Sequence, residues 1–183
     1  KYMNSADSAT TSLAGGNSSA GNMFNIINTS GAPLTITGFA QGPGSGNSSN
    51  PSASMVVWYM PAPYVLNNPS WTQLASGTVA LTSGAATGYL PVNVTIPAGG
   101  TYGFYVGITS GSVQYTNGTG TAGSSTWFQN NEFIITDGLG GSYPNPAFNP
   151  RNWNGKVYYG SVGCSEIRKE VSFAVNSDSA NAV

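Results

Sequence analysis

The run Met55-Val56-Val57-Trp58-Tyr59-Met60 is apolar at every position. β-Branched and aromatic residues favour extended structure, and an apolar run without alternation is typical of a strand covered on both faces. Residues 55–60 are therefore predicted to form a central strand at the centre of the hydrophobic core.

Similar β-rich runs recur along the chain and are separated by turn-forming residues. Segments rich in Gly and Pro, such as 42–46, 97–100 and 137–141, supply the positive or fixed φ that chain reversals need. No helix of normal length fits between the runs, and parallel sheets need crossover helices. The sequence therefore predicts an all-β fold, a single antiparallel β-sandwich that is jelly-roll-like. The expected strands are 23–29, 34–39, 54–60, 71–81, 89–96, 102–109, 112–116, 132–136 and 156–159.

Alternation within the second expected strand predicts a β-bulge. Leu34 and Ile36 share one face, whereas Phe39 has the opposite parity. Gly in a strand often marks an inserted residue, so a bulge at Gly38 would return Phe39 to the apolar face.

The composition is that of a β-protein made soluble by hydroxyl and amide groups rather than by ions. Of the 183 residues 6% are charged, the net charge is -1, and there is no histidine. Because no basic stripe is available to neutralise phosphates, nucleic acid is not an expected partner. No apolar stretch approaches the roughly 18 residues of a membrane-spanning helix, so membrane insertion is not expected. Weak self-repulsion favours association, and copies of the chain itself are the expected partner.

Side chains for acid–base or nucleophilic chemistry are scarce between Asp7 and Cys164. Glu132 and Asp137 are the only carboxylates there, and on an extended strand they lie roughly 17 Å apart with opposite parity, too far for a glycosidase pair. A serine has no histidine to activate it, although a Ser–Lys pair with Lys156 is formally possible. We therefore expect no enzyme activity, no catalytic residues and no cofactor. Asp137 is interpreted as part of an Asp-Gly turn, with weak calcium binding as the alternative, and no metal site is expected.

The two ends of the chain differ from its middle. We assign residues 13–163 to the β-sandwich domain, 1–12 to an N-terminal extension and 164–183 to a C-terminal extension strand. Each tail either folds back as an edge strand of its own domain or adds a strand to a neighbouring subunit by β-augmentation. The residues expected at subunit contacts are Tyr2, Met3, Ile167, Val171, Phe173 and Val175.

Two features bear on the compartment. Cys164 is the single cysteine and cannot form a disulfide within its own chain, so it is either a buried thiol or part of an intersubunit disulfide. The chain begins at Lys1 without an apolar leader, which is expected of a secreted protein whose signal peptide has been removed.

Four segments form a distinctive set of motifs: GGNSSAGNMFNI at 15–26, IPAGGTYGFYV at 96–106, YTNGTG at 115–120 and FNPRNWNGKVYY at 148–159. They resemble a β-sandwich domain family of secreted bacterial proteins whose members are mostly uncharacterised. The resemblance covers about residues 13–160. It implies a β-sandwich fold and an extracellular or cell-surface location, and it implies no catalytic residues.

Assembly is the expected function. We expect an extracellular structural protein, the repeating subunit of a surface filament, sheath or adhesive layer, assembled by exchange of terminal strands between subunits. The alternative is a carbohydrate-binding β-sandwich module of a secreted or cell-surface protein, with glycans as partners. Coplanar exposed aromatic residues beside Asn or Gln would favour sugar binding, whereas aromatic residues buried between sheets would favour assembly.

Three residues are candidates for sugar contact. Trp127 and Tyr143 are expected to be exposed, because polar or loop residues surround them. Arg151 is expected to be structural, with a sugar contact as the alternative. Its expected structural partners are the aromatic residues Trp153 or Tyr158, or the carboxylates Glu132 or Asp137.

Overall fold

A computed structural model describes residues 7–44 and 49–161. These residues form fourteen β-strands and no helix, and the strands make two antiparallel sheets that pack face to face. The predicted antiparallel β-sandwich is confirmed. The strands are β1 (Asp7–Thr10), β2 (Asn17–Ser19), β3 (Gly21–Asn28), β4 (Leu34–Gln41), β5 (Asn50–Met60), β6 (Thr72–Leu81), β7 (Leu90–Ile96), β8 (Thr101–Ile108), β9 (Val113–Asn117), β10 (Thr126–Gln129), β11 (Phe133–Thr136), β12 (Gly138–Gly140), β13 (Phe148–Asn152) and β14 (Gly155–Ser161).

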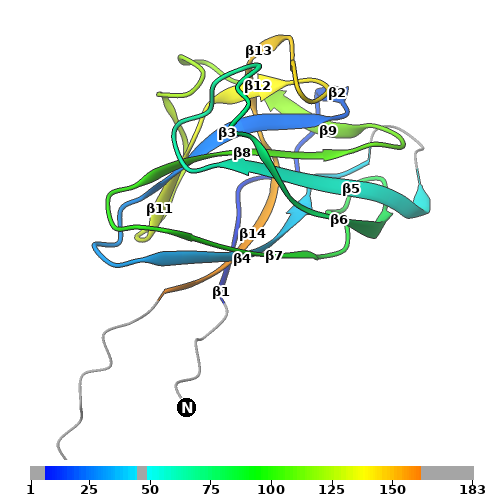
Figure 1. Cartoon of the computed structure of the whole chain (residues 1–183). Coiled ribbons are helices and arrows are strands. Elements are labelled where there is room, and N and C mark those ends of the chain that lie inside the picture. The colour runs from blue at the N-terminus through cyan, green and yellow to red at the C-terminus, as the bar shows by residue number, and fades with distance from the viewer. Residues whose placement is uncertain (1–6, 45–48, 162–183) are drawn as a thin grey trace, which may run out of the picture.

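The two sheets differ in size. The smaller sheet has the strand order β1-β14-β4-β7, and the larger one has the order β2-β9-β13-β12-β3-β8-β5-β6. Strand β11 also pairs with β3, and β10 pairs with β11. Figure 1 shows β4 and β7 running beneath the long strands β3, β8 and β5.

A cluster of aromatic rings lies among the aliphatic residues of the core between the sheets. Trp153 stacks on Phe24 at a centroid distance of 4.8 Å and meets Phe39 edge-on at 5.8 Å. Phe104 packs on both phenylalanines. Burial of such large rings from both sheets contributes much of the hydrophobic stabilisation of a small sandwich.

Strand β5 is covered on both faces, as its sequence predicts. Met55 and Val57 point into the core between the sheets, while Met60 belongs to a second apolar cluster on the outer face. Val56 and Trp58 also point outward and remain half-buried.

The predicted bulge in β4 is confirmed, one residue before Gly38. Tyr158 pairs with Gly38 and Tyr159 with Ile36, so Thr37 is the inserted residue. The pairing with β7 is also irregular between Ile36 and Gly38, although there the extra residue lies on β7. As a result of the bulge in β4, Leu34, Ile36 and Phe39 are all fully buried in spite of their mixed parity.

The chain passes from one sheet to the other at Trp153 and Asn154, between β13 and β14. Gly155 begins β14, where a Cβ atom would lie 2.4 Å from the Ala40 carbonyl oxygen and 2.6 Å from the Trp153 ring. Glycine therefore allows the backbone to approach the buried tryptophan at this crossing.

Part of the range expected to be an N-terminal extension is a strand of the sandwich. Residues 7–10 form β1, which pairs with β14 at the edge of the smaller sheet because its backbone groups complete that ladder. All six residues expected at subunit contacts lie outside the described residues, and so does Cys164; the six are Tyr2, Met3, Ile167, Val171, Phe173 and Val175.

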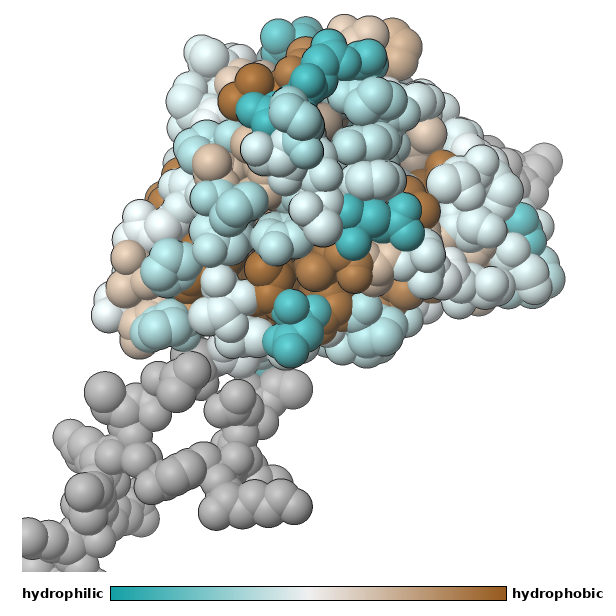
Figure 2. Space-filling view, in the orientation of Figure 1, coloured by the Kyte–Doolittle hydropathy of each residue, from teal (hydrophilic) through white to brown (hydrophobic). Residues whose placement is uncertain are grey.

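The surface carries few charges. Figure 2 shows the face of the molecule seen in Figure 1, and most of it has pale tones. The strongly hydrophilic residues lie in small separate groups. Over the described ranges, no helix has the length and hydropathy needed to cross a bilayer.

Candidate ligand-binding site

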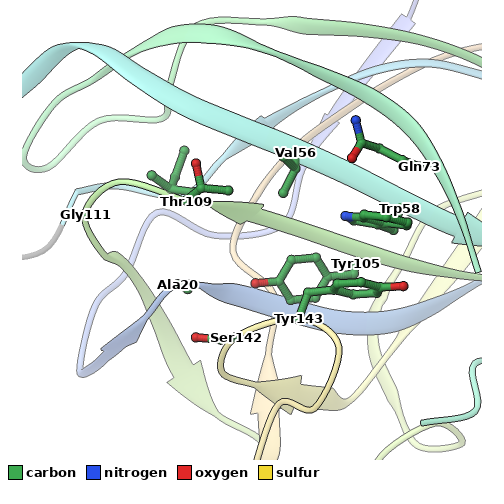
Figure 3. A pocket seen from close by; sticks show the side chains of 10 residues that line it. Ala20, Val56, Trp58, Gln73, Tyr105, Thr109, Gly111, Ser142 and Tyr143 are labelled. Carbon is green, nitrogen blue, oxygen red and sulfur yellow. The ribbon is translucent and has the colours of Figure 1, made fainter. Parts of the chain in front are cut away.

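A pocket opens on the outer face of the larger sheet (Figure 3). Its volume is about 500 Å³, which lies within the usual range for small-molecule sites. Strands β5, β6 and β8, the segments after β8 and β12, and Ala20 between β2 and β3 supply its lining. It is lined by Ala20, Val56, Trp58, Gln73, Tyr105, Ile108, Thr109, Gly111, Ser142 and Tyr143.

Two parallel rings form the aromatic wall of the pocket. Trp58 of β5 and Tyr143 of the β12–β13 loop stack at a centroid distance of 4.3 Å and an interplanar angle of 11°. Tyr105 packs against Tyr143 at 5.4 Å, and Trp71 meets it edge-on at 6.1 Å. Tyr143 is therefore packed on several sides before any ligand binds. Its side chain has little conformational entropy left to lose on binding.

The loop that carries Tyr143 is tied to the sheet. The buried Tyr105 hydroxyl donates a hydrogen bond to the Gly141 carbonyl oxygen at 3.0 Å. The Gly141 N–H donates to the Gly21 carbonyl oxygen at 2.9 Å, and the positive φ of Gly141 suits glycine. Burial raises the pKa of Tyr105 to about 12, while the Tyr143 backbone amide has a smaller, lowering effect. The hydroxyl therefore stays protonated and remains a donor at neutral pH.

The segment between β5 and β6 supports the wall from the other side. The Trp71 indole N–H donates to the Val65 carbonyl oxygen at 2.8 Å, and the Gly103 N–H donates to the Ala62 carbonyl oxygen at 2.8 Å. These bonds anchor the segment over β8 and fix Trp71 against Tyr143.

Uncharged polar groups surround the aromatic wall. Gln73 is exposed on β6 and is in register with Trp58, and Ser142 is exposed on the β12–β13 loop. The Trp58 indole N–H, the Gln73 amide and the Ser142 hydroxyl form no hydrogen bond with another described residue, so they are available to a ligand. The Thr109 hydroxyl donates weakly to the Ser54 carbonyl oxygen at 3.3 Å.

No lining residue carries a charge at neutral pH. Asp137 is buried beside Gly120, whose backbone N–H donates to its carboxylate at 2.7 Å. Glu132 faces the Tyr159 hydroxyl at 3.5 Å, and Lys156 lies over the Tyr158 ring. In the part of the chain that the structure describes, no three His, Cys, Asp or Glu side chains are grouped to hold a metal ion.

Among the residues expected to contact sugar, Tyr143 lines the pocket, but it is half-buried rather than exposed as expected. The expectation that Trp127 is exposed is wrong. Trp127 is half-buried against the core, and its indole N–H donates to the Trp153 carbonyl oxygen at 2.9 Å. This bond and the apolar neighbours draw the ring inward although the surrounding sequence is polar.

Arg151 has a structural environment, but its partner differs from those expected. Its guanidinium lies 5.7 Å from the centroid of the Phe148 ring and donates to the Pro150 carbonyl oxygen at 2.7 Å. Trp153 is buried in the core and therefore does not take this role. Arg151 does not line the pocket.

Trp58 and Gln73 were not identified as site residues from the sequence. The period-2 geometry of a strand places Trp58 opposite Met55 and Val57, so alternation gives the signal that it faces away from the core. Gln73 carries no signal by itself, because its place beside Trp58 depends on the register between β5 and β6.

No protein-family model matches this chain, and no curated protein matches it. One similar solved structure is that of the clostridial cysteine protease Cwp84 after propeptide cleavage. The match has a TM-score of 0.41 and 18% sequence identity, and it covers 85% of this chain and 40% of that one. This chain thus corresponds to well under half of the protease structure, and a similarity this distant does not define a shared activity.

Proposed function

We propose that this protein is a carbohydrate-binding module of a secreted or cell-surface protein. The observation that carries the proposal is the parallel pair Trp58 and Tyr143, which borders an uncharged pocket beside the free amide of Gln73. The two rings stack face to face and are half-buried rather than coplanar and exposed, so the support for sugar binding comes from the uncharged pocket that they border and from the exposed Gln73 amide beside Trp58.

Sugar chemistry matches the lining of the pocket. A saccharide presents C–H groups that pack on apolar and aromatic surfaces, and hydroxyl groups that both donate and accept hydrogen bonds. The pocket offers apolar surface from Val56 and from the Trp58 and Tyr143 rings, a donor from Trp58, and groups of both kinds from Gln73 and Ser142. A mostly apolar hollow with a few oriented polar groups is the usual form of a small-molecule site.

The extracellular location is part of the proposal. Its supports are the low charge, the surface based on hydroxyl and amide groups, and the resemblance to domains of secreted bacterial proteins.

Alanine at either wall residue is expected to weaken glycan binding at least tenfold, a loss of about 1.4 kcal/mol. The glycan is first identified on an array, and affinities of the wild type, Trp58→Ala and Tyr143→Ala are then measured by calorimetry. Tyr89→Ala is the matched control, since Tyr89 is an exposed aromatic residue next to β7 of the other sheet. Equal affinities in all four proteins, or no glycan bound on the array, would contradict the proposal.

Terminal-strand exchange between copies is a second candidate function. The observation that favours it is β1, a four-residue edge strand that pairs with β14 on one side and has no partner on its other side among the described strands. Such an edge presents unpaired backbone N–H and C=O groups to an incoming strand. A filament, sheath or adhesive layer could grow in this way.

In that case the full chain is expected to form particles much larger than 18.7 kDa, and a chain without residues 164–183 is expected to stay monomeric. Light scattering and electron microscopy measure the particle size of the full chain and of the truncated chain. A monomeric full chain would rule out assembly, and polymers of the truncated chain would rule out the C-terminal strand as the exchanged element.

A further inference from the structure

We infer that the pocket selects uncharged saccharides over sugars that carry a carboxylate or sulfate, and that Gln73 determines this specificity. The inference rests on the proposed carbohydrate binding and narrows it to one class of glycan. It follows from the charges near the pocket, from the hydrogen-bonding groups on its rim and from the position of Gln73.

Neither of the two described basic residues reaches the pocket. Lys156 lies on β14 of the smaller sheet, where its ammonium group contacts the Tyr158 ring. Arg151 is placed over Phe148 on β13. A carboxylate in the pocket would therefore lose hydration without gaining a cation, and an uncompensated buried charge is costly.

The rim instead suits hydroxyl groups. The Gln73 amide and the Ser142 hydroxyl each donate and accept, whereas the Trp58 indole N–H donates only. Figure 3 shows the Gln73 amide next to the Trp58 ring on the rim of the pocket. A hydroxyl can satisfy the acceptors and the donors together, but a carboxylate cannot satisfy the acceptor lone pairs of Gln73 and Ser142.

Gln73 is the rim position where a charge can be added without disturbing the fold. It is exposed, and it lies on the edge strand β6 in register with Trp58. A lysine there has the reach to place its ammonium group over the pocket while its methylene groups rest on the sheet. The variant Gln73→Lys should therefore admit an anionic sugar.

The experiment compares neutral and anionic oligosaccharides by calorimetry and tryptophan fluorescence. The neutral probes are cellotetraose, maltotetraose, galactotetraose and chitotetraose, and the anionic probes are tetragalacturonate and 3′-sialyllactose. The wild type is expected to bind its best neutral probe at least tenfold more tightly than either anion. Gln73→Lys is expected to shift this ratio at least tenfold toward the anions at low salt, and the shift should shrink in high salt as the charges are screened.

Two control variants distinguish the effect of a lysine at position 73 from the effect of added charge elsewhere and from the loss of Gln73 itself. Gln129→Lys adds the same charge at an exposed position on β10 and should leave the ratio unchanged. Gln73→Ala should weaken neutral binding without favouring anions.

Each failure has its own meaning. Wild-type affinity for an anion equal to that for the best neutral probe would overturn the selectivity while leaving the proposed function intact. An equal gain for Gln129→Lys would overturn the role of Gln73. No binding of any probe, together with no hit on the glycan array, would overturn the proposed function and this inference with it.

Discussion

Replacing Trp153 with alanine is expected to lower the free energy of unfolding by about 4 kcal/mol, the usual range for removal of a fully buried large aromatic residue. Its ring stacks on Phe24 and meets Phe39 edge-on, so its loss leaves a cavity at the centre of the core. Its indole N–H also donates to the Gln41 side-chain oxygen at 2.8 Å. The Gln41 side-chain nitrogen has no partner of its own, so this amide would become wholly unpaired while buried.

Urea unfolding followed by far-ultraviolet circular dichroism measures this loss. Trp153→Phe keeps an aromatic ring but removes the bond to Gln41, and it is expected to cost roughly half as much. Phe148→Ala is the control, because Phe148 is an exposed aromatic residue. A cost below about 1 kcal/mol for Trp153→Ala would mean that the aromatic cluster does not organise the core.

The longer strands were predictable because each carries its own pattern. All nine expected runs correspond to strands, and even the bulge in β4 follows from the parity of Phe39. The strands that sequence patterns missed have at most five residues each, and all but β10 are rich in Gly, Asn, Ser or Thr: β1, β2, β10, β12 and β13. They are strands because distant partners complete their hydrogen bonds, and no local pattern contains that information.

The Asn154-Gly155 pair shows the same limit. Asn-Gly is a strong hairpin signal, yet here the chain changes sheets instead of reversing. The glycine is needed because a Cβ atom at position 155 would collide with the Ala40 backbone and the Trp153 ring. Only the tertiary packing distinguishes this use of glycine from a turn.

The candidate site was predictable only in part. Tyr143 was identified because it lies in a loop, but Trp58 was assigned to the core as part of an apolar strand. Both faces of β5 do carry apolar residues, and the outer face is left partly open between the segment after β8 and the β12–β13 loop. Such an opening depends on the path of two loops that are distant in sequence. Trp127 was misjudged for the opposite reason, because long-range contacts bury a residue in a polar stretch.

The stability of this protein is expected to fall steeply between pH 10 and pH 12. Burial raises the pKa of Tyr105 from 10.0 to about 12, and burial together with Glu132 and Asp7 raises that of Tyr159 to about 12. Below pH 10 both tyrosines are protonated in the folded and the unfolded chain. Above pH 10 the unfolded chain loses these protons first, so ionisation favours unfolding until the folded pKa is reached.

The loss from Tyr105 alone amounts to about 3 kcal/mol, since each unit of pKa shift corresponds to about 1.4 kcal/mol. Urea unfolding at intervals from about pH 8 to pH 12 measures the slope. The variant Tyr105→Phe should have a shallower slope, although at pH 8 it is expected to be about 1 kcal/mol less stable through loss of the bond to Gly141. The same slope in both proteins would show that Tyr105 ionises as easily in the folded chain as in the unfolded one. In that case its hydroxyl would not be the buried anchor of the loop that carries Tyr143, and the wall of the pocket would lack the rigidity on which selective sugar binding depends.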